Sequence, residues 1–183
     1  MLLEVARSQV LIVDVQERLL PAMHEADALI ARCAVLLQAA ATMRVPVLMS
    51  EQYRKGLGVT AARLLDLRGD ASVLEKMHFS CAEDPAMAAH VRSLATQGRD
   101  QLLIAGIESH VCVLQSALGF KAAGLDVYVV ADAMTSRRPE SIALAQWRLR
   151  GAGISLVNTE MVAFEWLRIC AAAEFKTVSR LIK

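Results

Sequence analysis

The sequence predicts an α/β fold: a single-domain, doubly wound, three-layer sandwich around a six-stranded parallel sheet. Short segments that are apolar throughout alternate strictly with longer segments of helical periodicity. Strands without polar alternation are typical of sheets that are covered on both faces. Strict alternation of strands and helices favours parallel strands joined by helical crossovers. A chain of 183 residues suits one domain, so residues 1–183 are assigned to a single unit.

The strands follow from the apolar segments, each bounded by polar residues or turn signals. The first is "QVLIVDV" and the fifth is "LDVYVVAD", both rich in the β-branched residues that strands favour. The six expected strands are residues 9–15, 45–50, 72–76, 100–106, 125–132 and 153–158.

The helices occupy the intervals between these strands. Pro85 and Pro139 each suit the first turn of a helix, and Gly98, Gly124 and Gly151 each suit the end of one. The six expected helices are residues 25–43, 60–68, 84–96, 111–123, 139–150 and 159–171.

One long irregular segment is expected, "SEQYRKGLGVT" from Ser50 to Thr60. Gly56 and Gly58 give its backbone conformational freedom. Because it follows a strand, it should lie over the carboxyl edge of the sheet, where open α/β folds bind their ligands. Two interpretations remain open: a lid or subunit contact, and an ordinary surface loop.

Composition narrows the classes of partner and location. The net charge is +1, with Lys and Arg scattered among a nearly equal number of acids, so a nucleic-acid partner is disfavoured. Four cysteines without CxxC spacing indicate neither a zinc site nor a disulfide framework, and a reducing, cytoplasmic location is expected. The apolar stretch Ala26 to Met43 is interrupted by Arg32 and Gln38, so no membrane span is expected.

Three chemically capable residues should meet at the carboxyl edge of the sheet. Asp14 ends the first expected strand, Lys76 ends the third, and Cys112 lies just after the fourth. A buried aspartate needs a partner, and Lys76 is the obvious candidate. Taken alone, such a pair is more often a structural ion pair than a catalytic one.

Cys112 adds a potential nucleophile to that pair. A thiol in the first turn of a helix is stabilised as thiolate by the helix dipole, so a depressed thiol pKa is expected. Free N–H groups at the helix start could hold an oxyanion. The competing interpretation is a small buried apolar residue, which we assign to Cys33 and Cys170 and leave open for Cys81.

The sequence also resembles a known family. "VLIVDVQERL", "VLEKMHFSC" and "LIAGIESHVCVLQSALGFKAAGLDVYVVADAMTSR" resemble, in order, three signature blocks of the isochorismatase-like cysteine hydrolases. The resemblance extends over most of the chain, from about Val10 to Trp166. The "EQYRKGLG" loop and the segment from Ser136 to Leu167 resemble the small single-domain branch of that family, whose members mostly lack an assigned substrate.

The resemblance implies a catalytic triad at Asp14, Lys76 and Cys112, and cleavage of a small amide through a covalent thioester. It also implies a cis peptide bond between Ile107 and Glu108, which with Cys112 would form the oxyanion hole. Members of the family usually form dimers or larger assemblies. No metal or other cofactor is expected, because "SEQYRKGLG" lacks the histidine that metal-binding nicotinamidases carry there.

Further residues are candidates for the rim of the site. Gln16, Tyr53 and Phe79 are expected to contact substrate, with core packing as the alternative for Phe79. His110 could line the pocket mouth or act as a donor at the helix start.

Two further segments have alternative roles. Arg137 and Arg138 follow the fifth strand and suit either a carboxylate clamp or salt bridges at a subunit contact. The apolar helix 159–171 suits the core or a neighbouring subunit.

The leading functional hypothesis is a cysteine-dependent hydrolase of a small amide, a related C–N compound or an ester. One alternative keeps the fold but acts as a binding or assembly module, with Cys112 as a redox sensor. Another alternative is a nuclease-type role, which a steep salt dependence of RNA binding would support.

Overall fold

The computed structural model describes residues 1–182, and it confirms the predicted fold class: one all-parallel sheet flanked by helices on both faces. The strand order is β3-β2-β1-β4-β5-β6. The chain therefore builds outward from β1 in one direction and from β4 in the other, and the topological switch lies between these two strands. The strands are β1 (Ser8–Val13), β2 (Val47–Gln52), β3 (Ser72–Lys76), β4 (Gln101–Ile107), β5 (Asp126–Thr135) and β6 (Ser155–Val157).

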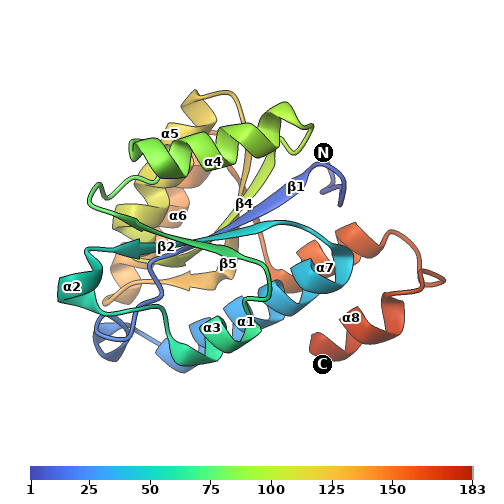
Figure 1. The fold of residues 1–183 in the computed structure, drawn as a ribbon, viewed down its shortest axis with the longest axis horizontal. Helices are drawn as coiled ribbons and strands as arrows, with labels where there is room; N and C mark the ends of the chain where they lie inside the picture. Colours follow the sequence, from blue (N-terminus) through green and yellow to red (C-terminus); the bar gives the residue numbers. More distant parts are fainter. Residues whose placement is uncertain (183) are drawn as a thin grey trace.

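Two layers of helices cover the sheet (Figure 1). One face carries α1 (Ala26–Met43), α3 (Ala62–Leu67), α7 (Thr159–Leu167) and α8 (Phe175–Leu181). The opposite face carries α4 (Pro85–Thr96), α5 (Leu114–Ala122) and α6 (Pro139–Gly151). Each layer buries its own hydrophobic cluster against the sheet, as expected of strands that are apolar on both faces.

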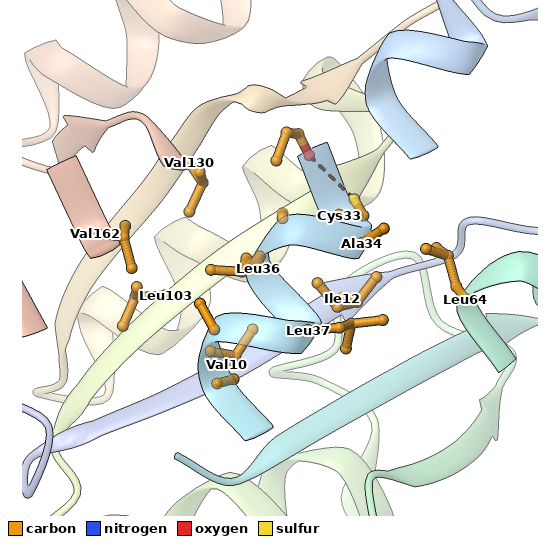
Figure 2. Close-up of a cluster of buried hydrophobic side chains, with 14 of the residues drawn as sticks. Val10, Ile12, Cys33, Ala34, Leu36, Leu37, Leu64, Leu103, Val130 and Val162 are labelled. Carbon is orange, nitrogen blue, oxygen red and sulfur yellow. Dashed lines mark hydrogen bonds between the residues drawn. The ribbon is translucent and has the colours of Figure 1, made fainter. Parts of the chain in front are cut away.

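Helix α1 forms the centre of one of these clusters. Figure 2 shows Leu36 and Leu37 of α1 against Val10 and Ile12 of β1. By length and composition, α1 could also cross a membrane, contrary to the sequence expectation. One face of α1 is buried against the sheet in this structure. A core helix of this kind can have the same length and apolar composition as a membrane span.

The C-terminal region departs from the prediction of one helix over 159–171. Helix α7 ends at Leu167, because Arg168 adopts a left-handed φ of 61°, and the short helix α8 follows. Trp166 is buried and Phe164 is exposed, so α7 has both a core face and a solvent face. Cys170 lies beyond the helix end and is exposed, so the prediction that it is buried was wrong.

The segment from Ser50 to Thr60 is more regular than predicted. Its first residues extend β2 to Gln52, and a helical turn, α2 (Arg54–Leu57), follows at the carboxyl edge of the sheet (Figure 1). The buried Glu51 carboxylate accepts hydrogen bonds from the Thr60 N–H at 2.7 Å and the Thr60 hydroxyl at 2.9 Å. These bonds close the segment into an anchored loop.

Candidate active site

The candidate site begins where β1 ends. Asp14 follows Val13 directly, is 1% exposed, and adopts a left-handed φ of 52°. Such a φ is uncommon for residues other than glycine, although aspartate tolerates it better than most. The Asp14 N–H donates to the Ser50 carbonyl at 3.1 Å, so the backbone leaves the strand while it is still held by β2.

A glycine on the neighbouring strand makes this geometry possible. Gly106 of β4 has a φ of 115°, and a Cβ at this position would lie 2.1 Å from the Val13 carbonyl oxygen. Only glycine fits so close to the backbone that carries Asp14. The register between β4 and β5 also shifts between Ile104 and Gly106.

The Asp14 carboxylate binds two donors inside the protein. Its Oδ1 accepts from the Ser50 hydroxyl at 2.6 Å, and its Oδ2 accepts from Lys76 Nζ at 2.7 Å. Lys76 Nζ also donates to Gln52 Oε1 at 2.8 Å and reaches the carbonyl of Phe79 at 3.3 Å. The two opposite charges are therefore paired and hydrogen-bonded, as buried charges must be.

Cys112 lies in a π-helical turn, Ser109–Val113, that leads into α5. The Val113 N–H donates at 3.2 Å to the Glu108 carbonyl, five residues earlier. The helical region thus begins two residues before the predicted position 111, with a wider first turn than an α-helix has. π-Turns occur often at functional sites. The Cys112 side chain is nearly buried, at 7% exposure.

The ion pair is close enough to the thiol for its charges to affect the pKa of Cys112. Burial raises the pKa of Cys112, and the Asp14 carboxylate raises it further through its charge and a hydrogen bond, while Lys76 opposes both effects. The expectation of a depressed thiol pKa was therefore wrong. Burial and the nearby carboxylate outweigh the position at a helix start, so the resting form is a neutral thiol beside a carboxylate.

The lysine keeps its charge. Burial lowers the pKa of Lys76, but Asp14 and the thiols of Cys81 and Cys112 raise it, and the net shift is upward. At neutral pH the site therefore contains the Lys76 ammonium beside a neutral Cys112 thiol.

The turn before Cys112 has the expected geometry. The Ile107–Glu108 peptide bond is cis. The Glu108 carboxylate accepts from the Arg137 N–H at 3.1 Å and from Arg137 Nε at 3.0 Å. His110 Nδ1 lies 3.0 Å from the Ser136 hydroxyl. The segment after β5 is thus hydrogen-bonded to this turn. The use of Ile107, Glu108 and Cys112 as an oxyanion hole stays a prediction.

The predicted substrate contacts lie in different environments. Gln16 is fully buried and donates to the carbonyls of Gln52 at 3.0 Å and Gly58 at 2.6 Å. Its side chain therefore joins β2 to the anchored loop, which favours a positioning role over substrate contact. Tyr53 and Phe79, in contrast, are substantially exposed after β2 and β3. The alternative of core packing for Phe79 is thereby excluded.

The sequence did not indicate two residues that hydrogen-bond to the Asp14–Lys76 pair, and it left the role of Cys81 open. Ser50 and Gln52 point to the same side of β2 and contact Asp14 and Lys76. Because strand side chains alternate, an expected strand that continued to Gln52 would have found both. Cys81 is fully buried near the ion pair, and burial raises its pKa to about 11 although Lys76 lowers it.

Within residues 1–182, no group of three or more His, Cys, Asp or Glu side chains is placed to hold a metal ion.

Known proteins resemble this chain over most of its length. The family model described as "Isochorismatase domain" matches residues 8–161. A Phytophthora sojae protein named "Secreted isochorismatase effector Isc1" is 34% identical over 183 residues, with 98% of this chain and 86% of that protein covered.

Solved structures show the same fold. The Caenorhabditis elegans structure described as MAR1 ribonuclease superposes with a TM-score of 0.92 at 27% identity, covering 100% of this chain and 92% of that one. The Escherichia coli YcaC gene product, described as an octameric hydrolase of unknown specificity, has a TM-score of 0.91 at 26% identity. It covers 99% of this chain and 90% of that one.

Proposed function

We propose that this chain, which belongs to the isochorismatase family, is a cysteine-dependent hydrolase that cleaves a small amide, a related C–N compound or an ester through a thioester. One observation carries the proposal: the buried Asp14 carboxylate is bound by Lys76 and Ser50, and it is close enough to the Cys112 thiol to raise the pKa of that thiol. A carboxylate beside a neutral thiol is arranged to receive its proton.

Acylation follows from this arrangement. As the Cys112 sulfur attacks the substrate carbonyl, the thiol proton passes to Asp14 and the carbonyl electron pair moves to oxygen. Backbone N–H groups near Glu108 and Cys112 are proposed to stabilise this oxyanion. When the C–N bond breaks, the leaving nitrogen takes the proton from Asp14, and a thioester on Cys112 remains.

Hydrolysis of the thioester repeats these transfers with water. Water attacks the thioester carbonyl and gives one proton to Asp14, which passes it to sulfur as the C–S bond breaks. Lys76 is proposed to remain charged throughout, because its raised pKa favours the ammonium. Its part is to orient Asp14 and to polarise the site.

A panel of small amides, ureas and esters tests the proposal. Wild type should hydrolyse at least one class, and Cys112→Ala and Asp14→Asn should abolish turnover, with circular dichroism used to compare only variants that are folded. Cys170→Ser is the matched control, since it removes an exposed thiol outside the site. Mass spectrometry of quenched reactions should detect an acyl group on Cys112. Full turnover in Cys112→Ala would exclude the mechanism.

A ribonuclease role is a second candidate, because a solved relative is described as a ribonuclease. The net charge of +1 does not favour a polyanion substrate. RNA cleavage that persists in Cys112→Ala, with binding that weakens steeply as salt rises, would favour this candidate.

A binding or redox-sensing role would be favoured if no substrate class is turned over.

Assembly and location are proposed from a relative's description and from the cysteine pattern. We expect a homo-oligomer, since one relative is described as octameric. A cytoplasmic location is proposed from the cysteine pattern, although the Phytophthora sojae relative is named as secreted. Size-exclusion chromatography with light scattering tests the first, and fractionation of cells tests the second.

A further inference from the structure

A cationic hollow lies beside the turn that carries Cys112. Its volume is about 380 Å³, and His110, Arg137, Arg138 and Ser141 line it. His110 comes from the π-helical turn, whereas the other three come from the segment between β5 and the first turn of α6. The tertiary structure thus assembles one recess from parts of the chain that are far apart in sequence.

The charges in this hollow do not cancel. Arg137 is paired with the Glu108 carboxylate through its Nε at 3.0 Å. Arg138, in contrast, has no ion-pair partner within residues 1–182. It is the N-cap residue of α6, and its side chain makes no capping hydrogen bond. Glu140 in the first turn of α6 is the nearest acid in sequence and is exposed. One arginine therefore remains available for an anion.

His110 and Ser141 add hydrogen-bonding groups that suit a carboxylate. His110 Nδ1 lies 3.0 Å from the Ser136 hydroxyl, and in the tautomer in which Nδ1 accepts this hydrogen bond, Nε2–H is the remaining ring donor. The Ser141 side chain supplies a hydroxyl donor. A planar guanidinium with such flanking donors matches the two oxygens of a carboxylate.

We infer that the hollow lined by His110, Arg137, Arg138 and Ser141 binds a carboxylate of the substrate, so that the preferred substrates are short acidic amides. His110 belongs to the same π-helical turn as Cys112, and Arg137 is bound to Glu108 just before that turn, so the hollow and the proposed nucleophile share one segment of the chain. The assignment of the carboxylate to a substrate rests on the proposed hydrolase function. The anion site itself does not.

Binding of succinate tests the anion site without turnover. Ligand-observed NMR titrations would compare wild type, Arg138→Gln and the control Arg150→Gln, an equal loss of charge at the exposed far end of α6. Wild type and the control should bind alike, and Arg138→Gln should bind roughly tenfold more weakly, about the effect of one charge-assisted hydrogen bond. Equal binding by all three proteins, or none by wild type, would overturn the inference.

Two pairs of substrates test whether the site serves catalysis. Succinamate and glutaramate each differ from the corresponding diamide by a single charged group. In wild type, kcat/KM should be higher for the acid of each pair, and this preference should fall roughly tenfold in Arg138→Gln but not in Arg150→Gln. Turnover without preference would overturn the carboxylate site and leave the hydrolase standing. Succinate binding without any turnover would support the anion site and count against the hydrolase.

Discussion

Lys76 Nζ and Asp14 Oδ2 lie 2.7 Å apart, and neither side chain is more than 1% exposed. This ion pair joins the ends of β1 and β3 across β2, which contributes Ser50 and Gln52 to the same network. The pair serves both the fold and the proposed chemistry, so the two contributions must be separated by experiment.

Removing one member of the pair should cost more stability than removing both charges. Lys76→Met leaves the Asp14 carboxylate buried without its cation, and we expect a loss of about 3–5 kcal/mol in the free energy of unfolding. Asp14→Asn combined with Lys76→Met removes both charges, and asparagine tolerates the left-handed φ at residue 14. Urea denaturation should show the double variant to be more stable than Lys76→Met, and strict additivity would refute the coupling.

The reactivity of Cys112 should rise when its proposed base is removed. Because the Asp14 charge raises the pKa of Cys112, Asp14→Asn should lower that pKa and increase the thiolate fraction near pH 8. Alkylation by iodoacetamide, followed by mass spectrometry against pH, should therefore accelerate in the variant that has lost hydrolysis. Slower alkylation at every pH would contradict the assigned interaction.

The order in which the thiols react should follow their burial. Cys170 is exposed, whereas Cys33 and Cys81 are buried, and burial raises the pKa of Cys81 to about 11. Native labelling at pH 8 should modify Cys170 first, and Cys33 and Cys81 only after unfolding. Experiments on Cys112 therefore need a Cys170→Ser background. Rapid labelling of Cys81 in folded protein would contradict the structure.

Gly106→Ala should disrupt both the sheet and the site. The added Cβ would meet the Val13 carbonyl oxygen at 2.1 Å, so we expect a loss of roughly 3 kcal/mol or more in stability, together with lost hydrolysis. Gly124→Ala is the matched control, because Gly124 also has a positive φ, of 92°, but has open space around its Cβ position. Equal losses in both variants would show that backbone strain, rather than the contact with β1, is responsible.

Stability at alkaline pH should report on the lysine. Because the pKa of Lys76 is raised in the folded protein, its contribution is complete below the unfolded value of about 10.4 and is lost as pH rises through the folded value. The free energy of unfolding should therefore fall above about pH 10 in wild type. In the double variant Asp14→Asn/Lys76→Met, this part of the decline should be smaller.

Much of the architecture was predictable, because burial on both faces leaves a strong signal in the sequence. The six strands and six helices that the sequence predicts all lie within a few residues of their expected positions. The ends were less predictable, because they depend on single backbone conformations. Arg168 ends α7 with a left-handed φ, and the contacts of the buried Glu51 shape the loop after β2. Neither is visible in hydrophobic periodicity.

The sequence by itself determined the parallel sheet, its carboxyl edge and the arrival of Asp14, Lys76 and Cys112 at that edge, because alternating apolar segments allow few other topologies. Only the tertiary structure decided the ionisation of the site. The pKa of a thiol depends on its burial and on charges a few ångströms away, so a thiol expected to be ionised is neutral beside Asp14. Only the tertiary structure decided the cationic hollow as well, because the fold brings Glu108 to Arg137 and leaves Arg138 without an acidic partner within residues 1–182.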